Sequence, residues 1–478
     1  MFPMPSQMCI CTLTGTMRND RIYRMKRKIY EKLLHWKQHS ANGNALLIEG
    51  ARRVGKSYIV EAFAEAEYER HLILDFSEVG RDIKDLFRNK LRNLDEFFML
   101  LQARTGVTLK PGNSLVVFDE VQRFPRAREA IKHLVADGRF HYIETGSHVS
   151  IRKNVENILI PSEELKVQMH PMDFEEFLWA LGRDALWGLV RDHFARRAPL
   201  DRVDHDLAME CFWQYLGVGG MPQAVEVFAD SRDLSAVEEK KRAILGLYRD
   251  DIGKFAGRLK AKVRAIWDEI PGALSRHERR FHPSDVGKNA RMRDMSAAFE
   301  WLSESMTVNI CHNASDPNVG LKLTEDSTAL KCYMADTGLL VSHAFSENEL
   351  ASGGIAARLV LGETDVNRGM LVENAVAQML RAASQGLFYY SRDDREDAKN
   401  RMEIDFLLTR SKVERSHNVF PVEVKSSSRY STASLDKFNR KFSSRIARSV
   451  VLHPANVKTK DSNLCLPLYM APLLPELT

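Results

Sequence analysis

Residues 50–57, Gly50-x-x-x-x-Gly55-Lys56-Ser57, have the residue types and the spacing of a phosphate-binding loop. In such a loop the glycines let the backbone N–H groups point at phosphates, the lysine bridges two phosphates, and the hydroxyl holds Mg²⁺. An apolar run at 45–48 precedes the loop and a helical stretch at 58–66 follows it, so a helix N-terminus adds its positive dipole. We predict that the nucleotide-binding residues are Gly50, Ala51, Arg52, Arg53, Val54, Gly55, Lys56 and Ser57.

The chemistry of this loop gives two of its residues further roles. Lys56 would also act in catalysis, and Ser57 would also be a metal ligand. A strand at 114–118 ends in two adjacent carboxylates, Asp119 and Glu120. Such a pair alone is usually solvated surface, but next to a phosphate loop it indicates nucleotide hydrolysis. We predict that Asp119 binds the nucleotide and orders Mg²⁺ through water, and that Glu120 polarises the attacking water.

A third strand, at 140–143, continues into Glu144-Thr145-Gly146-Ser147. A hydroxyl at this strand end can lie between Glu120 and the terminal phosphate and sense whether that phosphate is present. We predict Ser147 for this nucleotide-sensing role, with Thr145 as the second choice. The alternative interpretation is a turn hydroxyl that caps a helix.

The C-terminal part carries a second set of groups suited to chemistry on phosphodiesters. Asp405 lies on a predicted strand at 402–408. On the next strand, at 419–425, Glu423 and Lys425 point to the same face because side chains alternate along a strand. Two carboxylates can hold Mg²⁺ or Mn²⁺, and a lysine can position water and offset developing charge.

Glu373 adds a third carboxylate from a stretch with helical periodicity at 371–383. The set predicts a nuclease-type fold, but not whether cleavage is retained. Asp405 and Glu423 would hold the metal, and the predicted catalytic residues of this part are Glu373, Asp405, Glu423 and Lys425. The alternative is an edge strand whose Glu-x-Lys pair only prevents aggregation.

Composition places these groups in an ordinary globular chain. Of 478 residues, 44% are hydrophobic and 28% are charged, and no apolar run approaches the about 18 residues that a membrane helix needs. The net charge is only +5, yet residues 366–478 hold 18 Lys or Arg against 12 Asp or Glu. This end suits a DNA or RNA partner, and one helix offers a face that could track phosphates, with Lys437, Arg440, Lys441 and Arg445. Six scattered cysteines without zinc-like spacing predict reduced thiols and a cytoplasmic protein. The lack of a long apolar run predicts no membrane partner.

Nine stretches resemble, in order, the AAA+ P-loop ATPases of an archaeal and bacterial group whose C-terminal region was long labelled a domain of unknown function. They run from about residue 25 to 450 and read LLIEGARRVGKS, VVFDEVQ, YIETGS, HPMDFEEF, YLGVGGMPQAV, YMADTGLL, RGMLVENAVAQML, EIDFLL and PVEVKSSS. The C-terminal region is similar to the restriction-endonuclease-like PD-(D/E)XK fold. The resemblance implies ATP and Mg²⁺ as cofactors. By this resemblance Lys56 and Ser57 are Walker A residues, Asp119 and Glu120 are Walker B residues, and Ser147 is the sensor. The positions that match the nuclease-like motif are Glu373, Asp405, Glu423 and Lys425.

The predicted fold class is α/β, with a P-loop AAA+ ATPase domain, a helical region, a winged-helix module and an α/β restriction-endonuclease-like domain. Helices followed by two short strands suggest the winged helix, and such a module binds either DNA or protein. The predicted boundaries are 1–24 for a disordered leader, 25–165 for the ATPase core, 166–261 for the helical region, 262–345 for the winged-helix-like module and 366–470 for the nuclease-like domain.

The predicted function is an ATPase whose nucleotide cycle drives or gates a nuclease-like domain that acts on nucleic acid. Two alternatives stay open: a nucleotide-dependent switch or scaffold with an inactive nuclease fold, and an ATP-driven protein remodeller. A homo-oligomer through the ATPase domain is a further expectation. Relatives carry a Gly-Arg segment where this chain has residues 160–164, so the arginine finger is unassigned among Arg126, Arg128 and Arg152.

Overall fold

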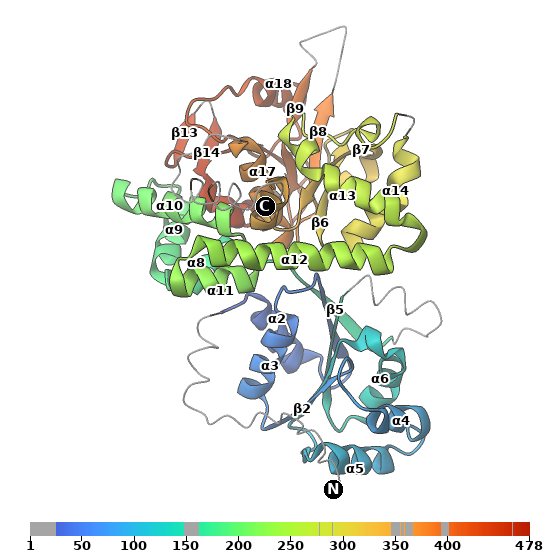
Figure 1. Ribbon diagram of the computed structural model, residues 1–478. Coiled ribbons are helices and arrows are strands. Elements are labelled where there is room, and N and C mark those ends of the chain that lie inside the picture. The colour runs from blue at the N-terminus through green and yellow to red at the C-terminus, as the bar shows by residue number, and fades with distance from the viewer. Residues whose placement is uncertain are drawn as a thin grey trace.

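A computed structural model describes residues 25–147, 162–276, 278–288, 290–345, 354, 358, 367–392, 401–460 and 462–478. The predicted leader, residues 1–24, lies outside this part of the chain. The N-terminal elements, from α2 to β5, form one body, and the helices and strands that follow form a second (Figure 1). None of the helices in the described ranges combines the length and the apolarity that crossing a bilayer requires.

The N-terminal body is built on a parallel sheet with the strand order β2-β3-β4-β1-β5. Its strands are β1 Ala45–Gly50, β2 Arg70–Asp75, β3 Ser114–Asp119, β4 His141–Gly146 and β5 Glu164–Met169. All parallel strands end at the same edge, so the loop after β1 and the carboxylates after β3 meet there. The apolar runs predicted as strands at 45–48, 114–118 and 140–143 are therefore confirmed as neighbours in one sheet.

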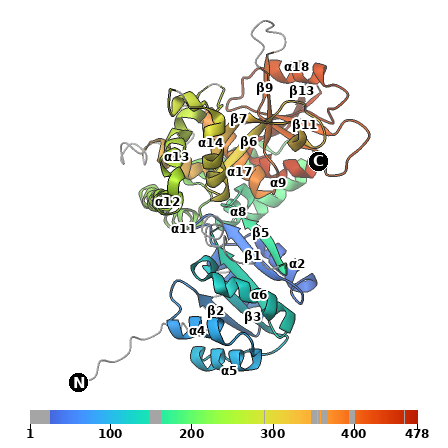
Figure 2. The same ribbon diagram turned by 90° about the vertical axis from the view of Figure 1, so that its right-hand side faces the viewer.

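Helices cover both faces of this sheet (Figures 1 and 2). They are α2 Ile29–His39, α3 Lys56–Glu67, α4 Arg81–Asn89, α5 Leu94–Thr105 and α6 Pro125–Asp137. Alternate residues of β1 supply two different cores: Leu46 belongs to the cluster that contains Phe63 of α3, and Leu47 belongs to the cluster that contains Ile131 of α6. Burial on both faces explains why the central strands read as continuous apolar runs.

The fifth strand corrects the predicted end of the ATPase core. β5 pairs in parallel with β1 and continues to Met169, so the sheet does not end at residue 165. Residues 166–169, which were assigned to the helical region, belong to the sheet. Their sequence alternates polar and apolar residues and half of the strand is exposed at the sheet edge, so they lack the apolar run that marks the central strands.

The region predicted as helical then follows. Its helices are α8 Phe174–Ala180, α9 Asp184–Arg196, α10 Arg202–Val218, α11 Pro222–Ser231 and α12 Leu234–Phe255. A capping box between Asp173 and Glu176 starts α8. Gly219 and Gly220 separate α10 from α11, and α12 runs across the junction between the two bodies (Figure 1).

The helix–helix–strand–strand order predicted for residues 262–345 is present. Its elements are α13 Lys260–Ser275, α14 Met292–Glu304, β6 Val308–Ala314, β7 Glu325–Met334 and α15 Thr337–Ala344. However, β6 pairs with β7 and also, in parallel, with β8 of the C-terminal part, which gives the sheet order β7-β6-β8-β9. The two strands predicted for a winged helix thus belong to a sheet that crosses the predicted boundary. A sequence pattern identifies a strand but not its partner, which explains the difference.

The C-terminal part completes the second body around a central helix, α17, whose residues from Met370 to Leu380 are buried. Its elements are α17 Arg368–Ala382, β8 Phe388–Arg392, β9 Met402–Ile404, β10 Phe406–Thr409, β11 Val419–Val424, α18 Ala433–Lys441, β12 Val450–His453, β13 Lys458–Lys460 and β14 Asn463–Pro467. A second sheet has the order β10-β11-β12-β14-β13. The strand predicted at 402–408 is interrupted at Asp405, which separates β9 from β10.

Short 3-10 helices occupy several connections between these elements. They are η1 Val121–Arg123, η2 Gly257–Leu259, η3 Pro283–Asp285, η4 Leu321–Thr324 and η5 Leu468–Leu477.

Candidate nucleotide site and C-terminal pocket

The phosphate loop curls at the end of β1 and leads into α3. Gly55, at the N-cap of α3, has φ = 96°, a left-handed conformation that costs glycine little. The Lys56 ammonium donates hydrogen bonds to the carbonyls of Gly50 and Ala51, at 3.1 and 3.0 Å. Lys56 is buried, and burial lowers the pKa of its amine to about 8, against the opposing influence of Glu120 and Asp119.

The carboxylates after β3 are held by the neighbouring strand β4. The Thr145 hydroxyl donates a hydrogen bond to Asp119, and the backbone N–H of Glu120 donates to Asp119 Oδ1 at 3.1 Å. Glu120 has φ = 53°, an uncommon conformation for a non-glycine residue that is characteristic of functional sites. Gln122 donates from Nε2 to Glu120 Oε2 at 2.6 Å, a contact that the pattern of apolar runs did not reveal.

The two candidate sensor residues lie in different surroundings. Thr145 is buried against Asp119, as described above. Ser147 lines a small cavity together with Arg52, Tyr248 and Thr307. The geometry therefore favours Thr145, the second choice, for contact with the carboxylates, and the assignment of Ser147 stays a prediction.

A cleft of about 1390 Å³ opens beside the phosphate loop. Lys56, Ser57 and Glu120 line it on the side of the sheet. Residues at the end of α8 and the start of α11 line the other side, among them Trp179, Leu181, Pro222, Gln223 and Glu226. The cleft thus brings the predicted catalytic groups together with residues of the helical region that motif reasoning did not single out.

This cleft fits ATP and Mg²⁺ on the chemistry of its donors. A buried ammonium, Lys56, has only carbonyl oxygens of its own loop as hydrogen-bond partners in the described structure. Ser57 supplies a hydroxyl and Asp119 a carboxylate, and Mg²⁺ is commonly held by one or two protein oxygens together with phosphate oxygens. These residues would hold the ion, which would neutralise phosphate charge when bound.

Arg27 precedes the phosphate loop in the sequence and holds it in place through hydrogen bonds. Its guanidinium donates to the carbonyls of Val54 and His170, at 2.8 and 2.6 Å, and to Glu176 at 3.1 Å. Arg27 is buried, so these bonds fix the loop to the segment that follows β5. In the sequence, Arg27 belongs to a run of basic residues at 18–30 that is typical of a solvent-exposed helix face. No sequence pattern distinguishes Arg27 from the other basic residues of this run.

Arg52 connects the phosphate loop to α12. Its guanidinium contacts Asp251 at 2.9 Å, and its backbone carbonyl accepts a hydrogen bond from the Tyr248 hydroxyl at 3.0 Å. Both partners come from α12, about 200 residues further along the chain, so the sequence offers no signal for this contact.

Of the three candidate arginine fingers, the structure argues against Arg128. Arg128 is 2% exposed and forms two hydrogen bonds with Glu164, at 2.7 and 2.8 Å, so it cannot reach into another subunit. Arg126 is exposed and pairs with Glu129. Arg152 lies outside the described residues.

In the second body, three of the four predicted nuclease-like residues share one pocket of about 560 Å³: Asp405, Glu423 and Lys425. Lys425 Nζ lies 2.8 Å from Glu423 Oε2, and the N–H of Val424 donates to Asp405 Oδ2 at 2.8 Å. Burial raises the pKa of Glu423 to about 7; Lys425 lowers this pKa and Asp405 raises it.

Glu373 is not among the residues that line this pocket, and its side chain is fully buried. One oxygen accepts from Tyr333 at 2.5 Å and from Lys331 at 3.1 Å, and the other contacts Arg279. Glu373 is therefore bound by cations of the same chain. Sequence reasoning assigned these cations to the neighbouring module and missed them.

Lys331 of β7 stands among three carboxylates. Its ammonium lies 3.1 Å from Glu373, 2.7 Å from Glu403 and 3.8 Å from Asp405, and its side chain is fully buried. Within the described ranges, no three Asp, Glu, His or Cys side chains are grouped as a metal site would require. An ammonium in the middle of the carboxylates does not fit a divalent cation at the same place.

The basic face predicted on and after α18 is partly engaged by the protein itself. Arg445 forms an ion pair with Asp316, Lys437 donates to the carbonyl of Arg401 at 3.2 Å, and Lys441 donates to the Tyr390 hydroxyl at 3.2 Å. These contacts orient the cations but also reduce what they can offer to phosphates.

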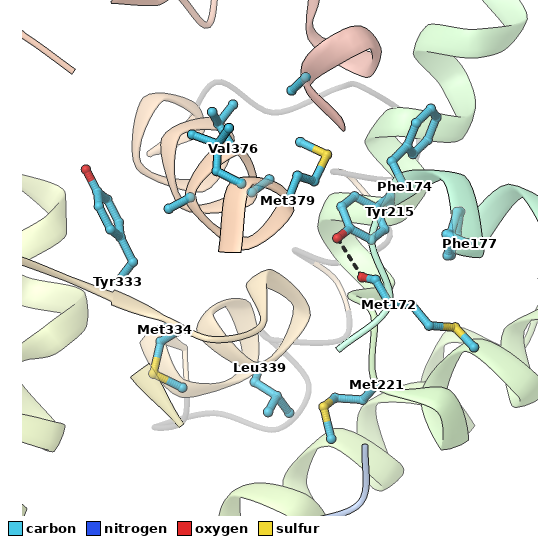
Figure 3. Packing of buried hydrophobic residues seen from close by; sticks show 14 of the residues in the cluster. Met172, Phe174, Phe177, Tyr215, Met221, Tyr333, Met334, Leu339, Val376 and Met379 are labelled. Carbon is cyan, nitrogen blue, oxygen red and sulfur yellow. Dashed lines mark hydrogen bonds between the residues drawn. The ribbon is translucent and has the colours of Figure 1, made fainter. Parts of the chain in front are cut away.

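A buried junction connects the cleft to α17. Met172, which lines the cleft, accepts hydrogen bonds at its carbonyl from the Tyr215 hydroxyl at 2.9 Å and from Gln378 Nε2 at 3.1 Å. Gln378 lies on α17 and also contacts Asp336, which accepts from the N–H of Gly220. Figure 3 shows Tyr215 directed at Met172, with Val376 and Met379 of α17 packed nearby.

Three separate segments of the chain match known protein families. Residues 42–178 match a family described as an AAA domain. Residues 209–349 and 368–470 match two families described as domains of unknown function, DUF8612 and DUF4143. No curated protein matches the chain. The N-terminal body is therefore an AAA-type P-loop ATPase domain with a parallel sheet, whereas the matches leave the winged-helix and nuclease-like assignments as predictions.

Several solved structures are distantly similar. A Walker-type ATPase of Pyrococcus abyssi is 14% identical, with 67% of this chain and 95% of that chain covered and a TM-score of 0.39. The RuvB Holliday junction branch migration motor of Thermotoga maritima is 11% identical, with coverage of 61% and 90% and a TM-score of 0.29. Drosophila ORC bound to DNA is 12% identical, with coverage of 73% and 98% and a TM-score of 0.28.

Proposed function

We propose that this chain hydrolyses ATP in the cleft beside residues 50–57 and uses the nucleotide cycle to gate a C-terminal nuclease-like domain that acts on nucleic acid. The observation that carries the proposal is the convergence of Lys56, Ser57 and Glu120 on one cleft at the edge of a parallel sheet. A buried lysine, a hydroxyl and paired carboxylates are the groups that phosphoryl transfer to water requires.

Each group has a distinct task in this proposal. Lys56 binds the terminal phosphates and offsets the charge that develops on them. Ser57 and Asp119 hold Mg²⁺, which neutralises phosphate charge when bound. Glu120 orients and polarises the attacking water, and its bond from Gln122 Nε2 fixes the direction of the carboxylate.

Two routes support communication between the cleft and the second body. Arg52 of the phosphate loop is paired with Asp251 of α12. Met172 lines the cleft and is hydrogen-bonded to Gln378 of α17, the helix that also carries Glu373. A shift of the phosphate loop or of Met172 on ATP binding would therefore act directly on packed elements of the second body.

Nucleic acid is the proposed partner because residues 366–478 carry a net positive charge and because basic side chains line the C-terminal pocket. Arg276, Arg279, Arg368 and Lys425 are among the residues of that pocket. A homo-oligomer formed through the ATPase domain, in the cytoplasm, is the proposed setting. A stable ATP-dependent ring without any nucleic-acid binding would instead favour a protein remodeller.

The second candidate is a nucleotide-dependent switch or scaffold in which the C-terminal domain binds without cleaving. The observation that favours it is Lys331, whose ammonium lies 3.8 Å from Asp405, one of the two predicted metal ligands, and contacts the neighbouring carboxylates of Glu373 and Glu403.

One experiment separates the two. ATP hydrolysis, nucleic-acid binding and cleavage are measured with Mg²⁺ or Mn²⁺, with and without ATP, on supercoiled, linear and single-stranded DNA and on RNA. The proteins are wild type, Lys56→Ala, Lys425→Ala and the exposed control Lys110→Ala. Loss of hydrolysis in Lys56→Ala but not in Lys110→Ala supports the ATPase assignment. Cleavage that Lys425→Ala abolishes and Lys110→Ala leaves intact would establish a nuclease, and loss of its ATP dependence in Lys56→Ala would establish the gating. Hydrolysis with salt-sensitive binding but no cleavage supports the switch. Absence of ATP hydrolysis in wild type would refute the proposed function.

A further inference from the structure

We infer that the ammonium of Lys331 takes the place of a divalent metal ion beside the C-terminal pocket, so that this pocket binds no divalent metal. The inference refines the proposed function of the C-terminal domain and does not depend on ATP hydrolysis. It rests on the position of one ammonium group relative to three carboxylates.

Three carboxylates surround the ammonium of Lys331. Glu403 and Glu373 are in direct contact with it, at 2.7 and 3.1 Å, and Asp405 lies slightly further away, at 3.8 Å. The side chain is fully buried, so water does not compete for these contacts. The ring of Tyr389 lies 5.0 Å from the same ammonium and closes another side of it.

A second cation completes the neutralisation. Arg279 contacts the Glu373 oxygen that Lys331 does not use, and Tyr333 donates to the oxygen that it does use. Glu373 thus has both oxygens engaged by groups of the same chain. A metal ion at this place would have to displace a buried ammonium or lie beside it, and like charges at such distances in a dry interior repel strongly.

The remaining carboxylate, Glu423, is also occupied. Its partner is Lys425, 2.8 Å away on the same strand. Asp405 accepts the N–H of Val424 with Oδ2 and faces Lys331 with Oδ1. Asp405 and Glu423, the two predicted metal ligands, therefore each have a protein cation or N–H as a partner.

The test measures Mn²⁺ binding by electron paramagnetic resonance without nucleotide, on full-length wild type, Asp405→Asn, Lys331→Met and the double variant. In wild type we expect Mn²⁺ binding to be unchanged by Asp405→Asn, because no metal binds at this pocket. Lys331→Met removes the ammonium that Glu373, Glu403 and Asp405 share and leaves their negative charge uncompensated there, so we expect Mn²⁺ affinity to rise at least about tenfold and to return to the wild-type value in the double variant. The exposed control Lys412→Met should match wild type.

Two results would overturn the inference. One is Mn²⁺ binding to wild type that Asp405→Asn abolishes. The other is a folded Lys331→Met protein whose Mn²⁺ affinity does not rise. If Lys331→Met does not fold, the wild-type and Asp405→Asn comparison still decides, and Lys331→Arg, which keeps the charge, should fold and bind no additional Mn²⁺. ATP hydrolysis is not measured in these assays, so their failure is distinct from failure of the proposed ATPase function.

Discussion

Lys56 is the residue on which the nucleotide site depends most directly. Its ammonium is buried and bonded to two carbonyls of its own loop, and burial lowers the pKa of the amine to about 8. A phosphate group would stabilise the charged form, so ATP binding and protonation of Lys56 are linked.

This linkage predicts a pH dependence of ATP affinity. The free protein loses the Lys56 proton as pH rises through about 8, whereas binding requires the charged amine. ATP affinity should therefore fall by about tenfold between about pH 7 and pH 9, with uptake of a proton on binding at the higher pH. Calorimetric titration in buffers of different ionisation heat measures both quantities. Lys56→Met should bind weakly with no such trend, and a flat wild-type profile would contradict the prediction.

The second prediction at this scale concerns the sensor. Thr145→Val removes the hydroxyl that donates to Asp119 and preserves the shape of the side chain. We expect kcat for ATP hydrolysis to fall about tenfold, equivalent to about 1.4 kcal/mol, with ATP affinity nearly unchanged. Steady-state kinetics of Ser147→Ala provides the comparison and should stay within about twofold of wild type. The reverse pattern would restore Ser147 as the sensor.

At the scale of elements, the turn between α10 and α11 packs closely against the start of α15. Gly219 has φ = 84°, and the N–H of Gly220 donates to Asp336 at the N-cap of α15. At Gly338, a Cβ atom would lie 2.3 Å from the carbonyl oxygen of Val218, so a side chain there forces backbone to move. The contact leaves room only for glycine.

Gly338→Ala should therefore destabilise the protein. Overpacking of this kind costs about 1–3 kcal/mol, which we expect to appear as a Tm several degrees below that of wild type in differential scanning calorimetry. Gly188→Ala is the matched control, because Gly188 lies inside α9 with open space around its Cα. That substitution should leave Tm unchanged or raise it slightly, since alanine favours helix. Equal Tm values for the two variants would disprove the packing argument.

At the scale of the whole molecule, α12 spans the junction between the ATPase domain and the second body (Figure 1). At one end Asp251 and Tyr248 contact Arg52 of the phosphate loop. Toward its start, Glu238 accepts a hydrogen bond from Ser342 of α15 at 2.8 Å. The helix thus touches both the nucleotide loop and the module that precedes the C-terminal domain.

We expect Asp251→Asn to weaken this communication. In wild type, a non-hydrolysable ATP analogue should slow amide hydrogen exchange in α12 and α17. In the variant, ATP affinity should stay within about threefold while at least about half of the protection in α12 is lost, because the ion pair with Arg52 is broken. Asp268→Asn is the control, since Asp268 pairs with Arg249 away from the loop. Unchanged protection in Asp251→Asn would exclude this route.

The phosphate loop, the Asp119–Glu120 pair and their strands were predictable from the sequence because each is a local pattern. Gly55 and Lys56 stand next to each other in the chain, and a buried parallel strand is an uninterrupted apolar run. The Glu423–Lys425 pair was predictable for the same reason, since alternation along β11 brings both to one face. β5 was missed because an edge strand is half exposed and lacks that run.

Contacts between distant segments were decided by the tertiary structure alone. The sequence by itself determined which residues could do chemistry and which strands and helices present them. Only the fold decided that Thr145 rather than Ser147 contacts Asp119, that Arg128 is buried against Glu164, and that Lys331 stands among the C-terminal carboxylates. Spacing along a chain reports neighbours within one element, whereas a buried charge finds its partner wherever packing brings an opposite charge, 42 residues away in the pair of Lys331 with Glu373.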